Sequence, residues 1–235
     1  MRGILLNSRW YMKDYKKEFI EFLLDMKSLK FGEFTLKSGR LSPYFLNTGM
    51  LYTGESVNKL GKFYASAIKD NIAQDFNVIF GPAYKGIPLV IATVNSLFSD
   101  FNINVSYSFN RKEAKDHGDM GLIVGKPLGA DDKVILVDDV ITAGTAVKES
   151  MEILRNNGNP SLIAVIVSVD RMEKGTGEKS AIGELRDSTG IEFFPIVNIL
   201  DIMEFLRDET NCLKYNIDKN MLGKMEDYRS KYGVQ

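Results

Sequence analysis

The chain is nearly free of cysteine and histidine, since its 235 residues include one of each, Cys212 and His117. A single cysteine cannot form a disulfide within the chain, and it cannot supply the clustered thiolates of a structural zinc site. A single histidine likewise excludes the His-Glu-x-x-His motif of zinc hydrolases, which needs two. The sequence therefore predicts a protein without internal disulfides or a thiolate metal centre. This composition suits a reducing cytosol, so we expect a cytoplasmic location.

An excess of charge of one sign is also missing, because 30 lysines and arginines are balanced by 31 aspartates and glutamates. A chain with so little net charge has no overall field that attracts nucleic acid or an anionic membrane. No apolar run approaches the roughly 18 residues of a membrane span. The apolar patch at residues 4–6 is too short for a secretory signal. We therefore expect no nucleic-acid or membrane partner, and we assign no function to residues 1–11.

Short apolar runs alternate with amphipathic stretches over most of the chain. Strands are expected at residues 77–83, 103–110, 133–139, 161–171 and 191–198, and helices at 13–29, 54–72, 85–98, 145–158, 178–190 and 199–209. Residues 31–49 contain shorter β-prone runs, and residues 111–121 read as a polar loop. Continuous apolar strands separated by amphipathic helices predict an α/β domain whose central, mostly parallel sheet is covered by helices on both faces.

The stretch "VILVDDVITAGTA", residues 134–146, joins a buried strand to a helix through two adjacent acids and a loop of small and hydroxyl residues. Asp138 and Asp139 cannot both be buried in a regular strand, because successive side chains point to opposite faces. The helix that follows offers unpaired N–H groups that favour a phosphate. Two carboxylates beside a phosphate would repel it unless they accept hydrogen bonds from neutral groups, and ribose hydroxyls fit that role. A sugar phosphate is therefore one interpretation, and a capped turn with two solvated acids is the other.

A nucleotide hydrolase is a third interpretation, because an aspartate after an apolar strand can hold magnesium. It requires the phosphate-binding pattern G-x-x-x-x-G-K-[ST], which is absent. The nearest stretch, "GLIVGKP" at residues 121–127, has the wrong spacing and a proline after the lysine.

Two other segments end in suggestive chemistry at the same edge of the predicted sheet, where such folds bind ligands. They are residues 81–86, which include Tyr84 and Lys85, and the strand end Asp170–Arg171. A basic segment, residues 111–118, follows a further strand. Its charged donors are Arg111, Lys112, Lys115 and His117. By composition alone this basic segment is a solvated loop, whereas its place after a strand suggests a cationic lid.

Four stretches in order resemble a known family. "VILVDDVITAGTA" resembles the phosphoribosyl pyrophosphate (PRPP) signature of type I phosphoribosyltransferases. "FGEFTLKSGRLSPYFLNTG", "FGPAYKGIPL" and "FNRKEAKDHG" resemble segments of the orotate phosphoribosyltransferases of bacteria and fungi. The likeness runs from about residue 12 to residue 194. It implies one phosphoribosyltransferase domain over residues 12–235, with a small hood (residues 12–53), a core (about 54–210) and a C-terminal helical segment (211–235).

The resemblance implies a pentosyltransferase that moves ribose 5-phosphate from PRPP to orotate in pyrimidine (UMP) biosynthesis. Asp138 and Asp139 would hold the ribose hydroxyls. The 5′-phosphate would be wrapped by the loop that follows them, Val140, Ile141, Thr142, Ala143, Gly144, Thr145 and Ala146. The diphosphate end would meet Tyr84, Lys85 and, from the hood, Lys37. The family needs Mg²⁺, which PRPP itself would mainly carry, with Asp138 and Asp139 close by.

In the family, the four charged donors of the basic segment, Arg111, Lys112, Lys115 and His117, contact PRPP. The active form is a homodimer whose loops reach the neighbouring site. Donors over a leaving diphosphate would stabilise the charge that grows as the C1′–O bond breaks, and a closed lid would exclude water. We favour Lys115 over His117 as the larger catalytic contributor, because neutralising this charge needs no proton transfer.

For the base, the resemblance assigns orotate contacts to Arg171, Phe45, Leu46 and Thr142. A guanidinium fork suits the orotate carboxylate. Leu46 departs from the family, where two phenylalanines are common, which puts the packing on the base in doubt but not the substrate. Two alternatives stay open: a phosphoribosyltransferase for a purine or uracil, and a PRPP-sensing regulator that binds DNA. The balanced charge argues against the regulator.

Overall fold

The structure is a computed structural model that describes residues 12–36, 38–115, 121–141, 144–175 and 177–234. Its strands are β1 (Leu29–Thr35), β2 (Leu41–Leu46), β3 (Val78–Gly81), β4 (Ser106–Lys115), β5 (Gly121–Gly125), β6 (Lys133–Asp138), β7 (Ser161–Asp170) and β8 (Glu192–Asn198). Its helices are α1 (Asp14–Asp25), the 3-10 helix η1 (Thr48–Met50), α2 (Gly54–Asn71), α3 (Gly86–Phe101), α4 (Thr145–Asn156), α5 (Ala181–Thr189), α6 (Ile199–Leu206), α7 (Glu209–Lys214) and α8 (Met221–Tyr232). Among the described residues, none of these helices combines the length and apolar character that a membrane crossing requires.

The central sheet has six strands in the order β5-β4-β3-β6-β7-β8. Strands β4, β3, β6, β7 and β8 are parallel, and β5 alone runs antiparallel to its neighbour β4. The expected α/β class and mostly parallel sheet are therefore confirmed. The expectation of a loop over residues 111–121 is wrong in part, because β4 continues to Lys115 and pairs with β5 in a hairpin.

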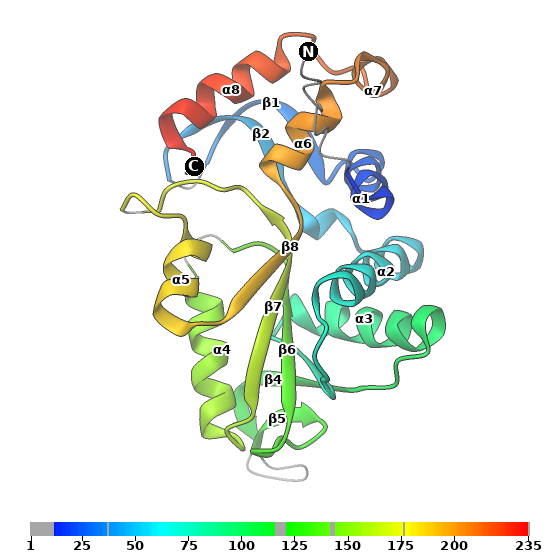
Figure 1. Cartoon of the computed structure of the whole chain (residues 1–235), viewed down its shortest axis with the longest axis vertical. Coiled ribbons are helices and arrows are strands. Elements are labelled where there is room, and N and C mark those ends of the chain that lie inside the picture. Colours follow the sequence, from blue (N-terminus) through cyan, green and yellow to red (C-terminus); the bar gives the residue numbers. More distant parts are fainter. Residues whose placement is uncertain (1–11, 37, 116–120, 142–143, 176, 235) are drawn as a thin grey trace, which may run out of the picture.

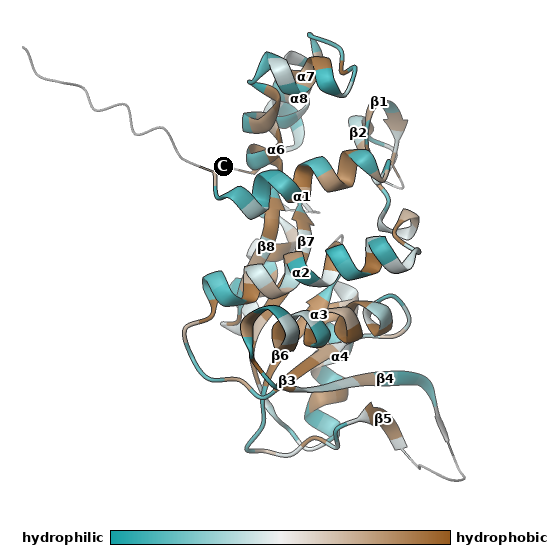
Figure 2. Ribbon diagram, turned by 90° about the vertical axis from the view of Figure 1, so that its right-hand side faces the viewer, coloured by the Kyte–Doolittle hydropathy of each residue, from teal (hydrophilic) through white to brown (hydrophobic). Residues whose placement is uncertain are grey.

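Helices cover both faces of the sheet, as the alternation of side chains within the strands requires. Ile79 and Ile135 share one hydrophobic cluster with α2 and α3, whereas Phe80 and Leu136 share another with α4 and α5. Figure 1 shows α2 and α3 on one side of the sheet and α4 and α5 on the other. Hydrophobic residues concentrate on the central strands, while the outer helix faces are largely hydrophilic (Figure 2).

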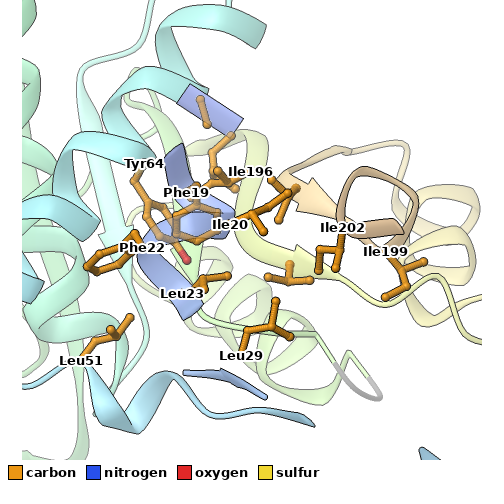
Figure 3. Close-up of a cluster of buried hydrophobic side chains, with 14 of the residues drawn as sticks. Phe19, Ile20, Phe22, Leu23, Leu29, Leu51, Tyr64, Ile196, Ile199 and Ile202 are labelled. Carbon is orange, nitrogen blue, oxygen red and sulfur yellow. The ribbon is translucent and has the colours of Figure 1, made fainter. Parts of the chain in front are cut away.

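The hood contains α1, the antiparallel β1–β2 hairpin and η1. Its helix α1 is anchored by Phe19, Ile20 and Leu23, all fully buried. Figure 3 shows these side chains gathered with Tyr64 of α2 and with isoleucines of β8 and α6. The hood is thus joined to the sheet by a continuous apolar cluster.

The C-terminal helices also lie beside the hood, which the sequence did not indicate (Figure 1). Tyr228 of α8 packs edge-on against Tyr44 of β2, with 6.1 Å between the ring centroids. The chain end then forms backbone hydrogen bonds to the segment after β7: Val234 N donates to Met172 O, and Lys174 N donates to Tyr232 O, each at 2.8 Å. Both ends of the chain therefore help to hold the region above the carboxyl ends of the strands.

Candidate active site

The acid pair stands where β6 ends and the backbone turns. Asp138 is buried, with 7 % of its surface exposed, and Asp139 is partly buried. The Asp138 carboxylate accepts a hydrogen bond from Asp139 N at 2.8 Å, and the Asp139 carboxylate accepts one from Val140 N at 2.7 Å. Burial, reinforced by the neighbouring Asp139 charge, raises the pKa of Asp138 to about 6. The pair is thus held by its own backbone at the strand end, as the sequence indicated.

Neighbouring elements fix the backbone of the acid pair. The Tyr64 hydroxyl of α2 donates to the Asp138 carbonyl at 2.7 Å. The Asp139 carbonyl accepts from the backbone N–H of Ser168 at 2.9 Å and from the Ser168 hydroxyl. Buried carbonyls satisfied in this way keep the turn rigid, so the two carboxylates are presented in a defined orientation.

The second oxygen of the Asp139 carboxylate, Oδ2, joins two other elements. It accepts a hydrogen bond from Lys85 Nζ at 2.6 Å and one from the Thr48 hydroxyl of η1 at 2.7 Å. Lys85 and Asp139, both predicted site residues, are therefore in contact. Thr48 was missed, because nothing in its local sequence distinguishes it from an ordinary turn threonine. Since the Lys85 side chain is 68 % exposed, its ion pair with Asp139 is a surface contact that a ligand can replace.

The loop after the acid pair leads directly into α4. Gly144 adopts a left-handed conformation with φ of 74°, and a Cβ there would lie 2.8 Å from Leu185 Cδ1. The left-handed backbone therefore favours glycine, and any side chain there would also require Leu185 to move. Thr145 starts the helix, whose first N–H groups have no partner within the helix and favour an anion. Val140 and Ile141 follow Asp139 directly. The predicted residues Thr142 and Ala143, which come next, are outside the described part of the chain.

The segment between β3 and α3 is a tight turn. A Cβ on Gly81 would lie 2.2 Å from the Gly86 carbonyl oxygen, so the turn tolerates no side chain there. Ala83 N donates to the Asn110 side chain of β4 at 3.0 Å, which anchors the turn to the neighbouring strand. The peptide bond before Tyr84 is cis. Tyr84 is 70 % exposed at this edge of the sheet, where a ligand can reach it.

The basic segment lies partly on the β4–β5 hairpin. Strand β4 pairs with β3 from Ser106 to Phe109 and no further. Arg111 and Lys112 therefore lie beyond the part of β4 that belongs to the body of the sheet. Figure 2 shows this hairpin extending outward. Arg111 donates to the Gly121 carbonyl across the hairpin at 3.0 Å. Lys115 ends β4, but its side chain is outside the described part of the chain, as are His117 and Lys37 as whole residues.

On the base side, Arg171 follows β7 and its side chain is 14 % exposed. Its guanidinium stacks 4.2 Å from the Tyr44 ring centroid and donates to the Ser42 hydroxyl at 3.1 Å, so it lies directly under β2 of the hood. It also forms an ion pair with Glu173 at 2.6 Å. Burial alone would lower the pKa of Arg171, but Tyr44 and Glu173 outweigh burial and raise it. Arg171 is thus permanently cationic at the same sheet edge as the acid pair.

The other predicted base contacts also lie on β2. Phe45 is 37 % exposed and stacks on Phe34 of β1, with 5.5 Å between the ring centroids. Leu46 is partly buried and faces Leu29 in the β1–β2 register. Phe45 and Leu46 therefore lie on the same hood strand as Ser42 and Tyr44, the two residues that contact Arg171.

Two cavities stand out among the described residues. One of about 160 Å³ is bordered by Thr48, Lys85 and Asp139 and is otherwise largely apolar. The other, of about 460 Å³, lies between α5 and β8 and is bordered by Asp170 at the end of β7, but by none of the residues predicted to contact PRPP or the base. The smaller cavity is the one that borders the predicted site, because Lys85 and Asp139 both line it. No group of three potential metal-ligating side chains occurs in the described ranges.

Comparison with known proteins agrees with this geometry. Residues 47–185 match the family described as phosphoribosyl transferase domain. The chain is 48 % identical over 224 residues, 95 % of its length and 100 % of the relative, to an orotate phosphoribosyltransferase of Lachnoclostridium phytofermentans. It is 49 % identical over 223 residues, with the same coverage, to that of Ruthia magnifica subsp. Calyptogena magnifica.

A crystal structure of orotate phosphoribosyltransferase from Francisella tularensis is similar in both fold and sequence. It superposes with a TM-score of 0.80 at 41 % identity, over 92 % of this chain and 100 % of that chain. The chain belongs to the orotate phosphoribosyltransferase family, with the type I phosphoribosyltransferase fold that its sheet and hood had indicated.

Proposed function

We propose that this chain transfers ribose 5-phosphate from PRPP to N1 of orotate, forming orotidine 5′-phosphate and diphosphate in pyrimidine biosynthesis. The observation that carries the proposal is a pair of opposite charges at one sheet edge. The acid pair, with Asp138 buried and Asp139 partly buried, stands at the end of β6, and the largely buried Arg171 follows β7, the next strand of the sheet. A ligand lying along this edge would place a sugar on the acids and an anionic base on the arginine.

The acid pair and the loop into α4 would hold the phosphorylated sugar. Asp138 and Asp139 would accept hydrogen bonds from the ribose hydroxyls, and the residues from Val140 to Ala146 would wrap the 5′-phosphate. The left-handed Gly144 and the first turn of α4 support this role. Because Asp139 already accepts a hydrogen bond from the Thr48 hydroxyl, a ribose hydroxyl would occupy the same kind of contact.

The diphosphate of PRPP would lie near Tyr84 and Lys85, with Lys37 approaching from the hood. In the reaction the C1′–O bond breaks and its electron pair leaves with diphosphate, while N1 of orotate forms the new bond to C1′ and gives up its proton to solvent. Donors of the basic segment, Arg111, Lys112, Lys115 and His117, would stabilise the departing charge. Lys115 would contribute most, because neutralising diphosphate requires no proton transfer.

The base would be recognised by its carboxylate and its flat ring. Arg171 would bind the carboxylate, and Phe45, Leu46 and Thr142 would border the ring. The stacked Tyr44 ring keeps the guanidinium plane fixed under the hood, which supports recognition of a planar anion. A neutral purine or uracil would offer no carboxylate to this arginine.

Mg²⁺ is proposed as the cofactor, carried mainly by PRPP. Mg²⁺ is usually held by one or two carboxylates together with substrate phosphates, and the adjacent Asp138 and Asp139 fit that arrangement. When bound, the ion would neutralise charge on the diphosphate.

We also propose a cytoplasmic homodimer in which each basic segment reaches the site of the partner subunit. The β4–β5 hairpin supports this, because it carries the basic segment away from the sheet of its own subunit (Figure 2). A loop that serves a neighbouring site has to leave its own domain in this manner.

Turnover with a panel of bases tests the substrate. Orotate absorbance should fall when PRPP and Mg²⁺ are added, and it should stay constant when a chelator is present. Hypoxanthine, guanine, adenine and uracil should not consume PRPP under the same conditions. Equal or faster turnover of any of these four bases would contradict the proposed role of Arg171.

A further inference from the structure

Glu173 lies three residues beyond the end of β7 and accepts hydrogen bonds from two sides. Its Oε1 atom accepts from Arg171 Nε at 2.8 Å and from the Tyr44 hydroxyl at 3.0 Å. Its Oε2 atom pairs with Arg40 Nη1 at 3.5 Å. The side chains of Glu173 and Arg171 are each 14 % exposed. This carboxylate therefore connects the base-side arginine to two residues of the hood.

These contacts fix the orientation of the Arg171 guanidinium. Nε and Nη2 both approach Glu173 Oε1, Nη2 also donates to the Ser42 hydroxyl, and the Tyr44 ring lies against the guanidinium plane. Both hydrogens of Nη2 and the single hydrogen of Nε are thus committed. A base carboxylate would bind at Nη1 and would reach Nη2 only by displacing Ser42, so the edge offered to it is determined by Glu173.

The backbone that carries Glu173 is held as firmly as its side chain. On one side of Glu173, the Met172 carbonyl accepts a hydrogen bond from Val234 N. On the other side, Lys174 N donates one to the Tyr232 carbonyl. Arg40 adds a bond from Nη2 to the Lys174 carbonyl at 3.0 Å. A carboxylate fixed at both backbone and side chain loses little conformational freedom on binding a substrate, which is the requirement for a preorganised site.

The charges of this cluster also favour one added anion. Arg40 and Arg171 are cationic and Glu173 is anionic, so the three together carry one surplus positive charge. A partly buried surplus charge is costly without a partner. The carboxylate of a base would complete the neutralisation, whereas a neutral base would not.

We propose that Glu173 is a positioning residue for recognition of the base carboxylate, acting through Arg171. This inference rests on the proposed function, because it assumes that Arg171 meets an anionic base. It assigns Glu173 no contact with PRPP. Its loss should therefore weaken the use of orotate selectively.

Steady-state kinetics of the Glu173→Gln variant test the role, because glutamine keeps the size of the side chain and removes its charge. The KM for orotate should rise about tenfold, the size of the effect of one charged hydrogen bond. The KM for PRPP should stay within about twofold, since no PRPP contact is removed. A matched control is Glu178→Gln, an exposed glutamate of the same segment, which should leave both constants unchanged.

A double-mutant cycle separates positioning from a general structural role. In an Arg171→Ala background, Glu173→Gln should change the KM for orotate less than twofold, because its effect passes through Arg171. An undiminished effect in that background would overturn the proposal. So would a parallel rise of both KM values, or a lower KM for orotate in the single variant.

Two further measurements keep the outcome clear. If Glu173→Gln does not fold, Glu173→Asp replaces it, and this shorter acid should show the same orotate-selective rise at about threefold or more. Turnover of orotate by the wild-type enzyme is measured first. A wrong substrate would appear in the wild type, whereas a wrong role for Glu173 would appear only in the variants.

Discussion

At the scale of single residues, the ionised carboxylate of Asp138 lowers the stability of the folded protein. Its carboxyl is buried, and within the described ranges no lysine or arginine forms an ion pair with it. Its pKa of about 6, raised mainly by burial, means that the folded protein resists its ionisation. Such a group destabilises the fold whenever it is charged, which is expected of a residue kept for function rather than for stability.

The first prediction is that Asp138→Asn stabilises the protein at pH 7.5 while abolishing activity. Because the pKa is higher in the folded state than in the unfolded chain, wild-type stability falls as pH rises from about 4 to 6. Removing the charge should raise the free energy of unfolding by about 1–3 kcal/mol at pH 7.5. The gain should vanish below about pH 4, where both forms are neutral. Urea unfolding at several pH values measures this.

Asp132→Asn is the matched control with the opposite sign. Burial raises the pKa of Asp132, but hydrogen bonds from Lys126, Gly129 and Asn77 outweigh it and lower the pKa. This substitution should lower stability at pH 7.5, and the loss should fade as the pH falls. A destabilised Asp138→Asn variant at neutral pH would show that the Asp138 charge supports the fold after all.

Several site residues could be predicted from sequence because their positions follow from the strand pattern. Asp138, Asp139, Lys85 and Arg171 each stand at or just after the end of a predicted strand, and parallel strands end at one edge. Glu173 could not be found in this way, since it sits in a polar stretch where any charge is unremarkable. Thr48 was missed because its local sequence is that of an ordinary turn and its partner, Asp139, is 91 residues away in the chain.

At the scale of elements, the contact between α2 and α3 depends on one glycine. A Cβ on Gly61 of α2 would lie 2.4 Å from the backbone oxygen of Ala92 in α3. Two helices that approach this closely leave no room for even a methyl group. The position of α2 matters for function, because its Tyr64 hydroxyl holds the Asp138 carbonyl.

The second prediction is that Gly61→Ala destabilises the protein although alanine favours helices. Helix propensity alone would add about 1 kcal/mol of stability, but overpacking against a backbone atom costs about 1–3 kcal/mol or more. The second effect should dominate and lower the melting temperature by several degrees. Gly223→Ala in α8 is the control, since a Cβ there meets nothing within 4 Å. It should be stabilising, and equal behaviour of the two variants would refute the packing account.

The strand pattern also explains which elements the sequence did not reveal. The continuous apolar runs of β3, β6, β7 and β8 predicted buried parallel strands, and the structure confirms them. Strand β5 is bounded by Gly121 and Gly125, both with positive φ, and the outer half of β4 is charged. Neither β5 nor the outer half of β4 shows an alternation of polar and apolar residues. The local sequence therefore did not predict that these two segments pair.

At the scale of the whole molecule, the site is enclosed by segments from both ends of the chain. The hood supplies β2, and α8 packs against β2 through Tyr228. The position of the C-terminal helices could not be predicted from the sequence, because only tertiary packing decides where a mostly polar helix lies. The β4–β5 hairpin extends outward at the end of the molecule opposite the hood (Figure 2).

The third prediction concerns sharing of the basic segment between subunits. Lys115→Ala should lower kcat by about 10²–10³-fold, as for the loss of one well-placed transition-state donor. Mixing it with the inactive Asp138→Asn/Asp139→Asn variant should restore activity, because one site of each mixed dimer would be intact. Random mixing would give about a quarter of the wild-type sites. Mixtures no more active than their components would show that each subunit uses its own segment.

The most direct measurement is a crystal structure of the enzyme with PRPP and Mg²⁺. The account predicts that the 5′-phosphate occupies the loop from Val140 to Ala146 and that the ribose hydroxyls contact Asp138 and Asp139. Lys85 should then leave Asp139 for the diphosphate. PRPP bound elsewhere, or an empty loop with Lys85 still paired to Asp139, would contradict it.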